Sequence, residues 1–332
     1  MDKPEPTTPL PATTSNPVAD TTVRQLNYTG KGGKLFSLWI VNWILTILTL
    51  GVYHFWAKTK VRRFFHENTL FLDEPFTYLG TGREIFVSAI KFVLIFVLPF
   101  ALVAAGVTIF LQNSVIAIIV PILYGVIFYC IKLYATLSGM RYRANRMSWR
   151  GLRFALKVRK GEYLGLLIRI SLLNLITLGL YRPYGDVRFL KLFINNTAYG
   201  NLHFTYDGDA REVTRGYWIN WILVPFTFGA SLLWYRARLL KHIAKSTKLG
   251  KLEFRYNITG GQLFWLGFSN GLLLLFSFGI LGFYALQRKM FLFVDTFRLR
   301  GMPDFAAIKK ASAEKDGAGA ADYLGADEDF GF

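Results

Sequence analysis

The sequence of 332 residues is poor in the side chains that build disulfides and metal sites, with one cysteine and four histidines. The lone Cys130 excludes an intrachain disulfide, and its apolar neighbours in the chain predict a small buried side chain. The histidines lack the paired spacings of metal ligands, and no phosphate loop ending in Gly-Lys-Ser or Gly-Lys-Thr occurs. We therefore predict no metal, no cofactor and no enzyme.

Charge is also scarce in this chain. Only 18% of the residues are charged, where a typical soluble domain has about 25%, and 53% are hydrophobic. The net charge is +18, and the basic residues gather at the ends of apolar stretches. Basic residues in that position anchor membrane helices and contact anionic headgroups. The composition predicts a membrane protein whose partners are anionic lipids, and it argues against nucleic-acid binding.

The two ends of the chain lack apolar stretches. Residues 1–24 are rich in Pro and Thr and have no basic segment followed by an apolar one, so we predict a disordered polar arm and no cleaved signal peptide. Residues 306–332 become small, glycine-rich and acidic, which predicts a disordered tail. We assign residues 25–305 to a single membrane domain.

Internal similarity divides this domain into five units of about 50 residues, the first centred on the apolar stretch Leu35–Leu50. From Thr49 to Gly80, 11 of 32 residues recur at an offset of 128. Weaker matches at offsets of 178 and 228 add two further units, which indicates a repeat protein. The predicted units are 27–76, 77–154, 155–204, 205–254 and 255–305.

The fold class predicted from these patterns is an all-α multi-pass membrane protein with about six apolar helices. They are expected near residues 35–57, 84–111, 115–137, 162–181, 217–235 and 262–286, with short F-x-Y strands such as Phe76-Thr-Tyr78 between helices. Two topologies remain open. In the first, each unit crosses the bilayer once, except the second unit, which crosses twice. In the second, each unit turns back at the Thr-Leu-Gly that follows its apolar stretch and returns to the side it entered. The 16 residues of Leu35–Leu50 are short for a crossing, which takes about 20.

One sequence pattern resembles a known family. It comprises a Gly-x-Gly-Gly-x-Leu-Phe start at Gly30, the Thr49-Leu-Gly51 turn, the Phe55–Lys58 segment with Arg62 and Arg63 after it, and Phe76-x-Tyr78. This pattern resembles the YjgN-like bacterial inner-membrane proteins, a family named as a domain of unknown function. The resemblance covers residues of about 25 to 305 and implies a multi-pass protein of the bacterial inner (plasma) membrane, without implying an activity.

Polar side chains inside the predicted helices are the first candidate sites. Asn42, Asn220 and Asn270 share one repeat position, where they either hydrogen-bond between helices or line a solute path. Lys91 and Arg169 also lie within predicted spans. A charge within a membrane span is a candidate functional site, but these two lie near helix ends, where long side chains reach the membrane surface.

Clusters of basic residues beside tryptophans are the second group of candidates, since they suit either interfacial anchoring or contact with anionic lipid headgroups. These residues are Lys58, Lys60, Arg62, Arg63, Arg141, Arg143, Arg146, Arg236, Arg238 and Lys241. Because many transporters are built from internal repeats, the function expected first is translocation or binding of a small solute or lipid. A membrane scaffold without transport is the alternative, and a membrane-embedded enzyme comes third.

Overall fold

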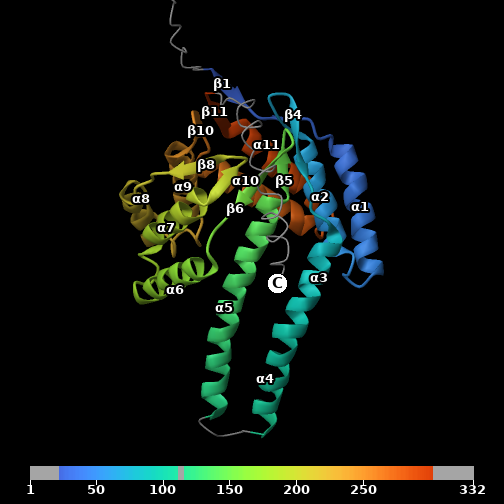
Figure 1. The fold of residues 1–332 in the computed structure, drawn as a ribbon, viewed down its shortest axis with the longest axis vertical. Coiled ribbons are helices and arrows are strands. Elements are labelled where there is room, and N and C mark those ends of the chain that lie inside the picture. The colour runs from blue at the N-terminus through green and yellow to red at the C-terminus, as the bar shows by residue number, and fades with distance from the viewer. Residues whose placement is uncertain (1–21, 111–115, 302–332) are drawn as a thin grey trace, which may run out of the picture.

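The computed structural model describes residues 22–110 and 116–301, in which pairs of helices alternate with pairs of short strands. Figure 1 shows the strands gathered at one end of the molecule and the helices extending away from them. The helix pairs are α1 (Gly32–Leu48) with α2 (His54–Glu67), α6 (Lys160–Ile176) with α7 (Arg182–Asn195), α8 (Arg211–Ile222) with α9 (Leu232–Ser246), and α10 (Gly260–Phe276) with α11 (Gly282–Thr296). The remaining pair joins α3 (Gly82–Phe92), η1 (Val93–Val97) and α4 (Leu98–Phe110) to α5 (Ile116–Asn145).

Tight turns separate the two helices of the four shorter pairs. In each turn a large apolar residue and the following glycine both have positive φ, as at Leu50 and Gly51. The same pair of conformations recurs at Leu178-Gly179, Phe228-Gly229 and Phe278-Gly279. A left-handed backbone ends an α-helix, and glycine adopts it without steric cost. These dipeptides therefore turn the chain back on itself and make each pair a helical hairpin.

The strands form a single antiparallel sheet that closes on itself. Its order is β1-β11-β10-β9-β8-β7-β6-β5-β4-β3-β2, and the closing segment is residues 23–28, whose first half pairs with β11 and whose second half pairs with β3. The strands are β1 (Val23–Gln25), β2 (Asn27–Tyr28), β3 (Thr69–Phe71), β4 (Glu74–Tyr78), β5 (Met147–Trp149), β6 (Leu152–Leu156), β7 (Thr197–Tyr199), β8 (Leu202–Tyr206), β9 (Thr247–Leu249), β10 (Leu252–Tyr256) and β11 (Phe297–Arg300).

Aromatic side chains fill the inner face of this closed sheet. The register places Phe76 opposite Trp149 and Phe154 opposite Tyr199. Side chains alternate between the two faces of a strand, so Phe76 and Tyr78 point inward while Thr77 between them is exposed. The largest buried core combines Phe76, Trp149, Phe154 and Tyr199 with apolar side chains of β9, β10, β11 and α11.

The helices form a closed ring that extends away from the sheet. Each helix contacts its hairpin partner and the nearest helix of the next hairpin, and α11 contacts both α10 and α1 to complete the circle. The return helices α2, α7, α9 and α11 carry most of the basic residues of the short hairpins, whereas α1 and α10 are largely apolar. The ring therefore encloses an interior that the sheet closes at one end.

The longest hairpin extends beyond the others, as α4 and α5 show in Figure 1. Within the described residues, two helical segments are long and apolar enough to cross a membrane, Gly82–Val103 and Ile119–Asn145, and neither is buried in the protein. The turns of the short hairpins also expose apolar side chains, since Leu50 is 95% exposed and Phe228 is 100% exposed. These surfaces suit a hydrocarbon environment.

The predicted all-α fold with six helices is wrong. Strands do occur at the F-x-Y positions, but all eleven strands of the described residues join into one closed sheet, which the sequence patterns did not predict. The predicted helices 35–57, 217–235 and 262–286 are each interrupted, because the left-handed turns at Gly51, Gly229 and Gly279 divide them. Residues 1–21 of the predicted arm and the predicted tail lie outside the described residues, whereas Val23 and Arg24 belong to β1.

Candidate functional site

The interior of the helix ring and the closed sheet holds a cavity of about 850 Å³. This volume lies in the range of about 300–1,000 Å³ that is typical of small-molecule sites. Aromatic side chains of the strands, among them Trp149 and Tyr199, line it on the sheet side. Residues of α2, α9, α10 and α11 line it on the helix side.

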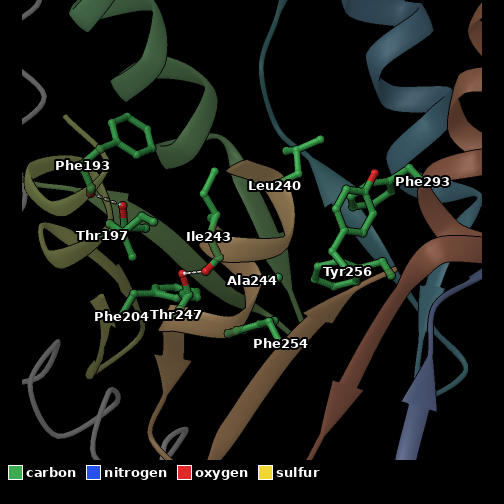
Figure 2. A pocket seen from close by; sticks show the side chains of 12 residues that line it. Phe193, Thr197, Phe204, Leu240, Ile243, Ala244, Thr247, Phe254, Tyr256 and Phe293 are labelled. Atoms are coloured by element: carbon green, nitrogen blue, oxygen red, sulfur yellow. Dashed lines mark hydrogen bonds between the residues drawn. The ribbon is translucent and has the colours of Figure 1, made fainter. Parts of the chain in front are cut away.

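A second cavity of about 310 Å³ adjoins the first and shares Leu240, Phe254 and Phe293 with it. Figure 2 shows these side chains with Thr197 and Thr247 at the same cavity. Both threonine hydroxyls donate to a carbonyl four residues earlier, Phe193 at 2.8 Å and Ile243 at 2.6 Å. Both hydroxyl donors are therefore satisfied by backbone carbonyls of their own chain segments, and the lining of this cavity is mainly apolar.

The charged residues that line the larger cavity are all cations. They are Arg62 of α2, Arg236 of α9 and Lys289 of α11, and no Asp or Glu of the described residues lines the cavity. Arg62 is half-buried, whereas Arg236 and Lys289 are exposed. Partial burial of the Arg62 charge without a counter-ion carries a desolvation cost. An apolar space whose charges share one sign therefore suits a ligand with an apolar body and an anionic group.

Arg62 belongs to a cationic cluster that also contains Lys58, one helical turn earlier, and Arg143 near the end of α5. Burial lowers the pKa of Lys58, and the neighbouring charges of Arg62 and Arg143 lower it further. The Arg62 guanidinium donates a long hydrogen bond of 3.4 Å to the hydroxyl of Tyr78. Among the described carboxylates, none lies within 4.0 Å of these three cations.

His66 lies one turn after Arg62 and also lines the cavity. Burial is the main cause that lowers the pKa of His66 from its ordinary value of 6.5, so the ring is neutral at pH 7. Its Nδ1 lies 2.8 Å from the carbonyl oxygen of Arg62 and donates to it in the neutral form. The charge at this wall is thus carried by Arg62 and not by His66.

One carboxylate lies close to the cavity cations without lining the cavity. Asp186 of α7 accepts a 2.8 Å hydrogen bond from the Tyr235 hydroxyl of α9, and its Oδ2 lies 3.9 Å from the Arg182 Nε. Burial raises the pKa of Asp186, while the Tyr235 hydrogen bond and the charges of Arg182 and Arg236 oppose that rise. Asp186 therefore joins two return helices beside Arg236.

The three predicted asparagines lie in three different hairpins and do not form one ring. Asn270 lines the cavity, donates to the Ala285 carbonyl at 3.3 Å and accepts from Arg288 at 2.9 Å. Asn42 and Asn220 are buried away from the cavity lining. Among the described residues, neither polar atom of the Asn42 side chain has a hydrogen-bond partner, and the Asn220 amide nitrogen also lacks one.

Lys91 and Arg169 lie on the outer part of the molecule. Each is nine residues after the first residue of its helix, Gly82 of α3 and Lys160 of α6, and each is exposed. Neither forms an ion pair within the part of the chain that the structure describes. Their exposure near helix starts agrees with side chains that reach the membrane surface.

The other predicted basic residues fall into two groups, those that contact a named partner within the protein and those characterised only by their exposure. Lys60 donates to the Tyr53 hydroxyl at 2.6 Å, and Arg146 pairs with Glu84 at 3.0 Å. The Arg238 guanidinium lies against Gly216 of α8. Arg63 and Lys241 are exposed on the same helices as Arg62 and Arg236, whereas Arg141 is half-buried. Of the ten predicted residues, only Arg62 and Arg236 line the cavity.

Several cavity residues were not predicted from the sequence. Lys289, His66 and the inward aromatic residues were missed because a closed sheet was not expected. The F-x-Y repeat was the available signal, since aromatic residues at alternate positions of a strand point to the same face of a sheet. Asp186 carried a signal too, because the segment Arg182–Asp186 departs from the pattern at His54–Lys58.

Two other kinds of site find no support in the geometry. Residues Gly267–Gly271 match the spacing Gly-x-Ser-x-Gly, but they lie inside α10 and not at a strand-to-helix turn, and the Ser269 hydroxyl donates to the Trp265 carbonyl at 2.6 Å. No group of three His, Cys, Asp or Glu residues that could hold a metal occurs within residues 22–110 and 116–301.

Exposed apolar hairpin turns, two membrane-length helices and basic return helices together indicate an integral membrane protein, and its interior holds an apolar cavity. The chain belongs to the family described as bacterial protein of unknown function (DUF898), whose model matches residues 23–233 and 220–325. This match confirms the family resemblance found in the sequence.

Proteins named inner membrane protein YjgN are among the relatives of this chain. The protein of Salmonella typhimurium is 31% identical over 134 residues, which is 39% of this chain and 30% of the relative. The protein of Escherichia coli K12 is 30% identical over 126 residues, which is 38% of this chain and 29% of the relative. The matches thus span under a third of these relatives, and they support a location in the bacterial inner membrane. No solved structure matches the chain.

Proposed function

We propose that this protein binds an anionic amphiphile, a molecule with an apolar tail and an anionic group, inside the helix ring. The observation that carries the proposal is the cavity of about 850 Å³, which is apolar and whose charged lining residues are Arg62, Arg236 and Lys289. The apolar tail would replace solvent against the aromatic strands. The anionic group would neutralise one or more of the cations.

The proposed setting is a multi-pass arrangement in which the short hairpins enter the bilayer from one side and return. At 17 residues α1 is about 25 Å long, so it is too short for a crossing of about 30 Å. Only the long hairpin of α3, α4 and α5 would cross fully. We also propose that the hairpins descend from one repeated unit, since their left-handed turns follow the offsets of 128, 178 and 228 residues.

Binding to purified, delipidated protein tests the proposal, with oleate and dioleoyl phosphatidic acid as probes. The double variant Arg62→Gln and Arg236→Gln removes two lining cations, and the matched control, Arg63→Gln with Lys241→Gln, removes two cations of the same helices that do not line the cavity. We expect the wild-type protein and the control to bind a probe and the cavity variant to bind it about tenfold more weakly, the loss expected for a charge-assisted hydrogen bond.

The alternative function is a membrane scaffold whose cavity serves no ligand. The repeated packing of hairpins supports this second candidate, because adjacent helices contact one another all around the ring. A wild-type protein that binds neither probe would favour the scaffold and overturn the binding proposal. Equal affinity in the cavity variant and its control would also overturn it.

A further inference from the structure

The cations of the candidate site are not spread evenly around the cavity. Lys58, Arg62 and Arg143 gather on α2 and α5, whereas Arg236 and Lys289 lie singly on α9 and α11. Arg62 is half-buried and lines the cavity, and Lys58 and Arg143 are exposed beside it. The cluster therefore joins the apolar interior to the surroundings of the protein.

The cluster has the composition of a phosphate site. Lys58 and Arg62 lie one helical turn apart on α2, and the Arg143 guanidinium is near enough to interact electrostatically with both. None of the described carboxylates lies within 4.0 Å of the three cations. The nearby hydroxyl of Tyr78 adds a further polar group. A carboxylate carries one charge and two acceptor oxygens, whereas a phosphate monoester carries a charge of about −1.5 to −2 and three terminal oxygens. Only the phosphate offers enough charge and acceptors for all three cations.

We propose that Lys58, Arg62 and Arg143 form a subsite for a phosphate monoester group, with the apolar part of the same ligand in the cavity. This inference rests on the proposed function and specifies its ligand class. Arginine suits the role because its fork of N–H donors binds two phosphate oxygens at once. The lowered pKa of Lys58 is consistent with the subsite, because an anion would relieve the repulsion from Arg62 and Arg143.

The test compares dioleoyl phosphatidic acid and oleate, which contain two oleoyl chains and one respectively and differ in the anionic group. The variants are Lys58→Gln and Arg143→Gln, neither of which removes a cavity-lining residue. Arg63→Gln on α2 and Lys132→Gln on α5 are matched controls, because both residues are exposed outside the cluster. Each cluster variant is expected to weaken phosphatidic acid binding about tenfold and to leave oleate binding unchanged.

Inorganic phosphate and glycerol 3-phosphate form the second arm and identify the source of the phosphate group. For a lipid ligand, millimolar phosphate competes with phosphatidic acid and not with oleate, and glycerol 3-phosphate alone binds far more weakly than phosphatidic acid. Equal affinity for glycerol 3-phosphate and phosphatidic acid would keep the phosphate subsite but overturn the apolar part of the ligand.

Three results have distinct meanings. Equal losses of oleate and phosphatidic acid in the cluster variants would overturn the selectivity for phosphate. Unchanged phosphatidic acid binding in both cluster variants would place the anionic group elsewhere and overturn the subsite, while the proposed function would stand. Failure of the wild-type protein to bind any probe would overturn both. Because a variant can lose binding through misfolding, thermal unfolding of each purified variant must match that of its control.

Discussion

Asp186 of α7 and Tyr235 of α9 are joined by a 2.8 Å hydrogen bond that links two return helices of the ring. The Asp186 side chain retains 33% of its exposure, so we expect a modest energy from this contact. A double-mutant cycle of Asp186→Asn and Tyr235→Phe should give a coupling free energy of about 0.5–2 kcal/mol. Denaturant unfolding in mild detergent measures it, and a coupling near zero would show that the two helices pack independently of this bond.

Gly82 at the start of α3 lies against Trp56 of the preceding hairpin. A Cβ atom at Gly82 would lie 2.7 Å from the Trp56 backbone, whereas one at Gly33 of α1 would meet nothing within 4 Å. Gly82→Val should therefore destabilise the protein by about 1–3 kcal/mol, the usual cost of overpacking. Gly33→Val is the matched control near a helix start. Similar melting temperatures for the two variants would contradict this packing.

Acid should weaken the fold through His66. Burial lowers the pKa of this ring in the folded protein, so the unfolded chain binds the proton more tightly. The contribution is present above the ordinary pKa of about 6.5 and is lost as the pH falls below it. Stability should drop between pH 7 and pH 5, and His66→Phe should reduce that drop. Thermal unfolding across this range checks the sign, and a pH dependence that His66→Phe leaves unaltered would refute it.

How the hairpins sit in the bilayer can be read from cysteine labelling. Thr77, Thr205 and Arg255 are exposed positions on β4, β8 and β10. Because all three strands belong to one sheet, single cysteines there in a Cys130→Ser background should share one side of the membrane. An impermeant thiol reagent added to intact cells should label all three or none. Labelling of Thr205→Cys alone would contradict hairpins that return to the side they entered.

Local signals in the sequence were sufficient for some features of this fold. The apolar helices after Gly32 and Gly260 and the basic return segments follow from periodicity and composition. Glu84 and Thr81 form a reciprocal capping box at the start of α3, a local pattern that the spacing of these two residues encodes. Each of these features depends on residues within one or two helical turns.

Other features depend on contacts between distant residues and were missed. The Thr-Leu-Gly motif allowed either a continuous helix or a turn, and only the left-handed conformations at Leu50 and Gly51 decide between them. The closed sheet requires residues 23–25 to pair with residues 298–300, which no local pattern encodes. The cavity follows from that closure, so its lining by Arg62, Trp149 and Lys289 could not be predicted.

Cross-linking with a photoactivatable anionic lipid tests the central claim most directly, because it locates the bound apolar tail. A phosphatidic acid with a diazirine in its acyl chain would be added to the delipidated protein, and the mixture would be irradiated. The covalent adducts would then be mapped by peptide mass spectrometry. We predict adducts on the cavity residues Leu240 of α9 and Met290 of α11, suppressed by excess unlabelled phosphatidic acid. Adducts confined to exposed residues such as Trp265 and Phe268 of α10, and unaffected by competitor, would contradict a lipid site inside the ring.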